Sequence, residues 1–225
     1  MNHIKPYILF ESVEKESIEL IDKFKKNYGT DLDMKLKPYQ IEIINKAFSY
    51  FNKKFIKNKI QKIKLKDLGA VHGRWTDKEK EHYMTLNSTI FDFKRKFENV
   101  PYNIFIIVHE IAHCIDHIER ISYSKKWQSI SGWKKCDIND RIPEGYDRYI
   151  EKRKGREMAG HKKSDWVYKE GSNFCRKYSS RNPREDFADS FAFAVFKNDD
   201  KFKGEGGQEK LDIINKLISN IDKLK

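Results

Sequence analysis

The chain has few cysteines, and their spacing excludes two common uses of this residue. Its 225 residues include only Cys114, Cys136 and Cys175. An odd number of cysteines without CxxC or CxxxC spacing indicates neither a disulfide framework nor a cysteine zinc knuckle. We therefore predict reduced, unpaired thiols, with Cys114 acting as a small buried apolar residue.

Long apolar runs are also missing. The N-terminal apolar patch covers only residues 8–10 before acidic residues begin, and the longest uninterrupted run covers residues 104–108. Neither is long enough for the core of a signal peptide or for a membrane span. We expect a protein with no membrane span, cytoplasmic as encoded unless it is exported by a route without a cleaved signal.

Acidic residues are too few to balance the basic ones, and the formal net charge is +12. Such a charge raises the question of a nucleic-acid partner. However, the lysines are spread along the whole chain, and outside a first cluster over 53–66 they alternate with Asp and Glu. Lysine also greatly outnumbers arginine, so the charge does not favour nucleic acid as the main partner.

Apolar periodicity changes along the chain and predicts both helices and strands. Residues 11–28 and 38–58 have helical spacing, with Pro38 at a first helical position. Shorter extended segments follow and predict a small antiparallel sheet of about three strands: 60–65, 70–75 and 82–87. Ser88 is expected to cap a short helix that ends near Phe97.

The second half of the chain contains three further predicted helices and one irregular region. A strongly apolar helix is expected over 104–118 and two more over 182–195 and 208–224. Residues 122–177 are irregular, which indicates a lid or an insertion that lines a cleft. The predicted fold is α+β and mostly helical, with an N-terminal helical segment, 1–60, packed on a domain over 61–225.

The apolar helix carries the pattern HExxH. His109 and His113 lie four residues apart, so one helix face presents both imidazoles to a single tetrahedral cation, and Glu110 stands beside the open position. There Glu110 can act as a general base for a metal-activated water. The competing interpretation is a pair of core histidines with ordinary hydrogen-bond partners.

A hydrolytic zinc site needs a third protein ligand, and two carboxylates compete for this role. Glu119 is ten residues after His109, but the glycine that would turn the chain there is replaced by Asp116. Glu185 is the better candidate, since it shares a helix face with Asp189 and a cation would offset their repulsion. Glu185 also stands three residues after Asn182, where it could serve in a capping box.

The segment N-P-x-E-D-F-A-x-S-F-A, with Tyr178 seven residues before Glu185, adds to the HExxH pattern. Together these motifs resemble the gluzincin peptidases related to the catalytic domain of anthrax lethal factor and to the clostridial Pro-Pro endopeptidases. The resemblance covers roughly residues 68–198 and implies a zincin-like fold. It implies zinc held by His109, His113 and Glu185, and an oxyanion stabilised by the Tyr178 hydroxyl.

The same resemblance implies two supporting roles. Asp189 would anchor a ligating histidine through the outer ring N–H. A cleft-edge strand would pair with an extended substrate; its residues are His82, Tyr83, Met84, Thr85, Leu86 and Asn87.

These patterns predict a zinc metallopeptidase that acts on a protein or peptide substrate, with Zn²⁺ as its cofactor. Two other classes stay open at this point. One is a catalytically inactive zincin-like binding or toxin module. The other is a basic nucleic-acid-binding protein in which the HExxH pattern is incidental.

Overall fold

The computed structural model describes residues 4–57, 59–78, 81–150, 152–153, 156–157 and 165–222. It is mixed α+β and about 51% helical, as predicted at this level, while the zincin-like fold stays a prediction. The α-helices are α1 Ile4–Tyr28, α2 Pro38–Phe48, α3 Lys53–Ile56, α4 Tyr102–Glu119, α5 Lys125–Ile130, α6 Pro183–Val195 and α7 Gly207–Asp222.

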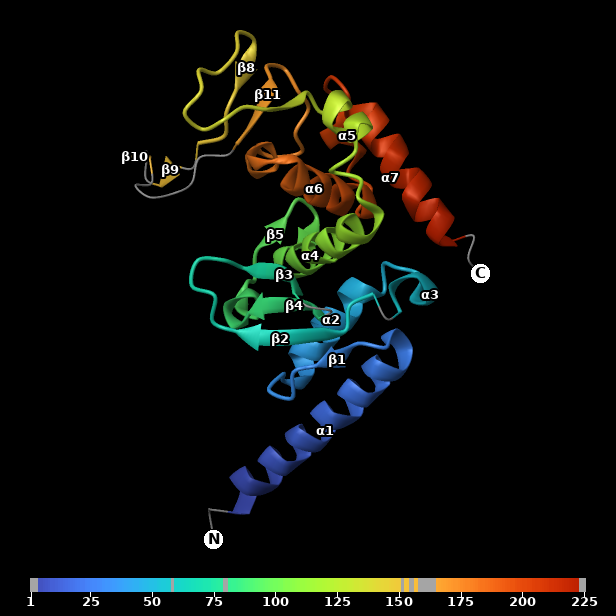
Figure 1. Cartoon of the computed structure of the whole chain (residues 1–225). Coiled ribbons are helices and arrows are strands. Elements are labelled where there is room, and N and C mark those ends of the chain that lie inside the picture. Colours follow the sequence, from blue (N-terminus) through green and yellow to red (C-terminus); the bar gives the residue numbers. More distant parts are fainter. Residues whose placement is uncertain are drawn as a thin grey trace. The chain divides into compact units, whose positions relative to one another are not determined.

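Three short 3₁₀ helices and eleven short strands complete the described elements (Figure 1). The 3₁₀ helices are η1 Ser88–Asp92, η2 Lys177–Arg181 and η3 Asp199–Phe202. The strands are β1 Asp31–Leu32, β2 Lys62–Lys66, β3 Gly73–Lys78, β4 Glu81–Asn87, β5 Lys96–Phe97, β6 Val100–Pro101, β7 Trp133–Lys135, β8 Tyr146–Asp147, β9 Lys152–Arg153, β10 Arg156–Glu157 and β11 Trp166–Lys169.

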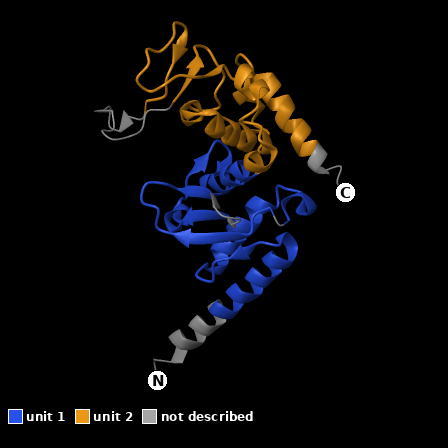
Figure 2. Cartoon of the chain, viewed as in Figure 1, with its two compact units in different colours: residues 1–114, 221–225 blue, residues 115–220 orange. Residues whose placement is uncertain are grey.

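The chain forms two compact units (Figure 2). The first contains residues 1–114 and 221–225, and the second contains residues 115–220. Residues 1–60, predicted as a helical segment packed on the rest, therefore belong to the same unit as the strands that follow them. The boundary at 114 falls within α4, which carries the HExxH pattern.

The main sheet of the first unit is mixed rather than antiparallel, which corrects the prediction. Its strand order is β1-β2-β4-β3. Strand β2 runs parallel to both β1 and β4, and only β3 and β4 pair in antiparallel fashion. The three predicted strands correspond to β2, β3 and β4. The long connection from β1 through α2 and α3 to β2 lets these neighbours run in the same direction.

The prediction that 82–87 forms an edge strand is wrong. Strand β4, which contains these residues, has β2 on one side and β3 on the other. Its backbone hydrogen-bonding groups are therefore engaged on both sides, and an extended peptide cannot add to it. The two end strands of this sheet are β1 and β3.

Aromatic packing joins the helices of the first unit. Phe24 of α1 lies 4.9 Å from Phe48 of α2 between ring centroids, and Tyr28 lies 5.1 Å from the same ring. The predicted helix over 38–58 is interrupted after Phe48. The side chain of Asn52 accepts a hydrogen bond from the backbone N–H of Lys54 and starts α3 as a separate turn.

The predicted helix from Ser88 to Phe97 is also shorter than expected. Only the 3₁₀ helix η1 forms, and its cap is Asn87, whose side chain accepts from the backbone N–H of Thr89. Residues 96–97 instead pair with 100–101 as a small hairpin that leads into α4.

The second unit combines helices α5, α6 and α7 with a sheet of order β7-β11-β8. This sheet lies within the region that the sequence left irregular, so part of that region is regular structure. Trp127 and Phe187 form the centre of the packing, with ring centroids 5.3 Å apart. All three cysteines are free, as predicted, and all three are buried, which was predicted only for Cys114. Within the described part of the chain, no helix has the length and apolar character that crossing a membrane requires.

Candidate metal centre

Helix α4 brings the HExxH residues into a buried setting. It begins directly after Pro101 and ends where Arg120 adopts a positive φ of 57°, a conformation that terminates helices. His109, Glu110 and His113 are 7%, 6% and 8% exposed. The two imidazole rings lie 4.7 Å apart between centroids and nearly perpendicular, at 86°. Helical spacing thus places both rings together, as predicted.

Strand β3 approaches Glu110 at a glycine. A Cβ atom built on Gly73 would lie 2.7 Å from both Cγ and Oε1 of Glu110. Such a distance is far shorter than carbon atoms tolerate, so any other residue at position 73 would displace the Glu110 side chain. Gly73 therefore leaves the space that Glu110 occupies, and motif reasoning missed this residue.

Helix α6 begins with a strong cap, as predicted. The side-chain oxygen of Asn182 accepts hydrogen bonds from the backbone N–H groups of Arg184 and Glu185, at 3.0 and 3.1 Å, and Pro183 occupies the first helical position. Buried Phe187 and Phe191 give the helix an apolar face. The cap fixes the backbone at Glu185, whose side chain is half-buried.

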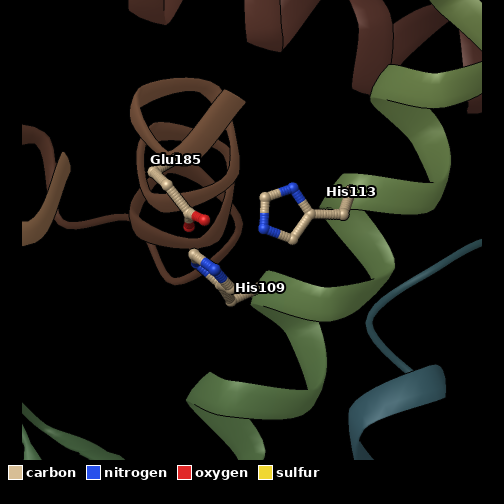
Figure 3. Close-up of side chains that lie close together, drawn as sticks. All are labelled: His109, His113 and Glu185. Carbon is tan, nitrogen blue, oxygen red and sulfur yellow. The ribbon is translucent and has the colours of Figure 1, made fainter. Parts of the chain in front are cut away.

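Three side chains form a group that could hold a metal ion: His109 and His113 from α4, and Glu185 from α6 (Figure 3). One ligand atom from each residue lies within 4.8 Å of the other two. In a tetrahedral zinc site with bonds of about 2.1 Å, ligand atoms are roughly 3.4 Å apart, a difference that side-chain rotations can close. Two imidazoles and one carboxylate are also a known ligand set for catalytic zinc, so the donors fit such an ion.

The other candidate ligands do not join this group in the described residues. Glu119 is exposed at the end of α4, so the alternative third ligand of the sequence analysis is not supported. The remaining histidines of the described residues, His72, His82 and His117, are likewise outside the group. His161 lies outside the described residues.

Tyr178, the predicted oxyanion donor, lies in η2 and is half-buried. Its hydroxyl oxygen accepts a hydrogen bond of 3.1 Å from Nη1 of Arg181. Burial raises the pKa of the Tyr178 hydroxyl well above its ordinary value, and the negative charge of Glu185 raises it further. The phenol therefore keeps its proton at neutral pH and can act as a hydrogen-bond donor. The role of Tyr178 in stabilising an oxyanion stays a prediction.

Asp189 is fully buried and ties η2 to α6. Its two carboxylate oxygens accept from Nε and Nη2 of Arg176, at 2.7 and 2.6 Å, and one of them also accepts from the hydroxyl of Ser179 at 2.8 Å. Arg176 and Ser179, which come before and after Tyr178 in the chain, are thereby held to α6, the helix that carries Glu185. The predicted anchoring of a ligating histidine by Asp189 is not tested by these contacts and stays a prediction.

A second buried network also holds α6. The ammonium group of Lys210 from α7 lies 2.8 Å from Oδ1 of Asp186, and both side chains are fully buried. Oδ2 of Asp186 accepts from the indole N–H of Trp133 at 3.1 Å. Burial raises the pKa of Asp186, and the charge of Lys210 acts in the opposite direction. The sequence offers no local signal for this pair, since its members are 24 residues apart.

Comparisons with protein-family models, with curated proteins and with solved structures find no match to this chain. The resemblance to gluzincin peptidases therefore remains a prediction from the motifs. The residues of the site carry the functional argument.

Proposed function

We propose that the chain is a zinc-dependent peptide hydrolase. The observation that carries this proposal is the group formed by His109, His113 and Glu185, three donors of a kind and number that suit a catalytic zinc ion. When bound, such an ion would polarise the scissile carbonyl and lower the pKa of a water molecule.

The residues of the chain supply the proton transfers. Glu110 is next to a ligand in sequence and is only 6% exposed. Its carboxylate would accept a proton from the attacking water and then deliver it to the leaving amine. The Tyr178 hydroxyl, which keeps its proton, would donate a hydrogen bond to the oxygen on which negative charge develops in the transition state.

The sheet suggests where an extended substrate would lie. Strand β3 is at the end of the strand order and carries Gly73, which lies against Glu110. A peptide that pairs with the outer edge of β3 would therefore pass beside the general base. We propose β3 for this role, in place of the interior strand β4.

Elemental analysis of untagged protein, purified without added metal, tests the ligand set. We expect about one zinc per chain in wild type and in Glu110→Gln, and much less in Glu185→Ala. Glu209→Ala, which removes an exposed glutamate of α7, is the matched control and should keep the metal. A wild-type chain that cannot be loaded with zinc would refute the proposal.

Peptide turnover is tested separately. Wild type is incubated with a diverse peptide pool, and new N-termini are identified by mass spectrometry. We expect new termini with wild type but not with Glu110→Gln or after chelation of the metal. Full zinc occupancy without turnover would favour the inactive binding module, whereas salt-sensitive DNA retention without zinc would favour nucleic-acid binding.

A further inference from the structure

Asn87 is a polar residue in the buried part of the first unit. It is the last residue of the interior strand β4, and it is fully buried. The side-chain amide of asparagine has two N–H donors and an oxygen that can accept two hydrogen bonds. Burying such a group costs free energy unless these positions are filled, so its partners indicate its role.

All four hydrogen-bonding positions of the Asn87 amide are filled. Nδ2 donates to the backbone carbonyl oxygens of Gly69 at 3.0 Å and of Val71 at 2.9 Å. Oδ1 accepts from the backbone N–H of Thr89 at 3.2 Å and from its hydroxyl at 3.1 Å. Carbonyl oxygens only accept and a backbone N–H only donates, so these partners fix the orientation of the amide.

The two ends of the amide serve different parts of the chain. The oxygen caps η1, a role that serine or aspartate fills about as well as asparagine. Neither of those residues offers two N–H donors, however. The contacts with residues 69 and 71, rather than the cap, therefore explain why asparagine occupies position 87.

Residues 67–72 connect β2 to β3 and extend beyond the ends of both strands (Figure 1). Asp67 and residues 69–71 are exposed, so apolar burial does little to hold this connection. Its internal hydrogen bonds are local. Oδ1 of Asp67 accepts from the backbone N–H of Gly69 at 2.8 Å, and the N–H of Val71 donates to the carbonyl oxygen of Leu68 at 3.2 Å. The contacts from β4 tie the connection to the sheet.

The connection ends directly before Gly73, the residue that leaves space for Glu110. The backbone N–H of Asn87 donates to the carbonyl oxygen of His72 at 2.9 Å, and Gly73 is paired with Leu86 in the strand register. Asn87 thus holds both the connection and the first step of β3. A Cβ on Gly73 would lie 2.7 Å from Glu110, so a small shift of the backbone here changes the room for the carboxylate.

We propose that Asn87 is a positioning residue of the candidate site: it holds the 67–72 connection and thereby sets where Gly73 meets Glu110. The catalytic part of this inference rests on the proposed hydrolase function. Asn87 acts through β3 and needs no contact with the substrate. Because a displacement of about 1 Å can cost roughly a hundredfold in rate, loss of this anchor should slow the chemical step.

Two variants separate the anchor from the cap. Asn87→Ser and Asn87→Asp both keep an oxygen that can cap η1, and both remove the pair of N–H donors. The control is Thr30→Val, which removes another buried side-chain hydrogen bond of the first unit, from the Thr30 hydroxyl to the carbonyl oxygen of Ile60 at 2.7 Å. All changes are made in the full-length chain, and zinc content and thermal unfolding identify the variants that fold.

Hydrogen–deuterium exchange tests the anchor without any turnover. We expect faster exchange over residues 67–73 in both Asn87 variants and no change over α2. The Thr30→Val control should keep wild-type exchange over 67–73. Unchanged exchange over 67–73 in a folded Asn87 variant, or equally faster exchange in the control, would overturn the proposal.

Kinetics test the link to Gly73. The substrate is a fluorogenic peptide built on a site that wild type cleaves in the peptide pool. In both Asn87 variants kcat should fall roughly tenfold with KM within about twofold, whereas Thr30→Val should keep kcat. In the Gly73→Ala background the same Asn87 changes should lower kcat by less than about twofold, since the Glu110 carboxylate is already displaced.

The outcomes separate this inference from the hydrolase itself. If wild type turns over and the Asn87 variants keep its kcat, or if their losses multiply fully with that of Gly73→Ala, the positioning role is refuted and the hydrolase stands. No turnover by zinc-loaded wild type would refute the hydrolase and the catalytic part of the inference, while the exchange measurement still decides whether Asn87 anchors the connection.

Discussion

Helices α4 and α6 both supply candidate metal ligands, but their surroundings differ. Helix α4 is surrounded by apolar packing, with Ile107, Val108 and Ile111 fully buried. Helix α6 has, beside its apolar face, two buried carboxylates in ion pairs, with Asp186 bound to Lys210 and Asp189 bound to Arg176. Apolar packing tolerates small shifts, whereas hydrogen-bonded ion pairs have directional geometry. We infer that α6 is the more specifically fixed helix.

The largest effect on stability is expected from Lys210→Met, which leaves Asp186 buried without its cation. Breaking a buried ion pair in this way typically costs about 3–5 kcal/mol. The free energy of unfolding, measured with urea, should fall by about this amount. The double variant Asp186→Asn/Lys210→Met should recover part of the loss; a loss equal to the sum of both single losses would show that the pair is not coupled.

The loss of stability in the Lys210→Met variant should also depend on pH. Burial raises the pKa of Asp186 in the folded state above its ordinary value of 3.8. The folded state then binds a proton more readily than the unfolded state, so stability falls as pH rises through the interval between the two pKa values. Without Lys210 this pKa rises further, and the loss should be greater at about pH 8 than at about pH 5. A loss independent of pH would contradict this account.

Ile107→Ala tests the apolar packing around α4. It removes fully buried atoms from α4 and should lower the free energy of unfolding by about 2–5 kcal/mol, with no dependence on pH. Zinc content per folded chain should stay unchanged, because neighbouring side chains can relax into the space. A selective loss of metal in this variant would show that α4 is fixed as specifically as α6.

Gly73→Ala tests whether Glu110 of α4 needs the space that Gly73 of β3 leaves for its side chain. The added methyl group would displace the Glu110 carboxylate, so hydrolysis should fall roughly ten- to hundredfold, or about 1.4–2.7 kcal/mol, while zinc content is retained. The control is Gly69→Ala, where a Cβ meets nothing within 4 Å. Because Gly69 has a φ of 60°, which alanine adopts only with strain, the hydrolytic activity of its variant is compared per folded molecule. Equal activity of Gly73→Ala and wild type would remove Gly73 from the site.

The smallest effect is expected from Asn182→Ala. This change removes the cap of α6 and should lower the free energy of unfolding by about 1 kcal/mol. Asn182→Ser keeps an acceptor oxygen and should recover most of that loss. If both variants are equally destabilised, the side chain of Asn182 contributes by packing rather than by capping.

The sequence alone determined the parts that depend on short spacing. Four residues separate His109 from His113, and a helix necessarily places such residues on one face. Asn182 followed by Pro183 likewise defines the start of α6, because capping involves only adjacent backbone groups. The α+β character followed from the change in apolar periodicity.

Only the tertiary structure decided which distant residues meet. It favoured Glu185 over Glu119 in the metal group, made β3 an edge strand and β4 an interior one, and paired Asp186 with Lys210. Strand order and buried ion pairs depend on how segments far apart in the chain pack. Local periodicity holds no information on that packing, because the same alternating pattern suits an edge strand and an interior one.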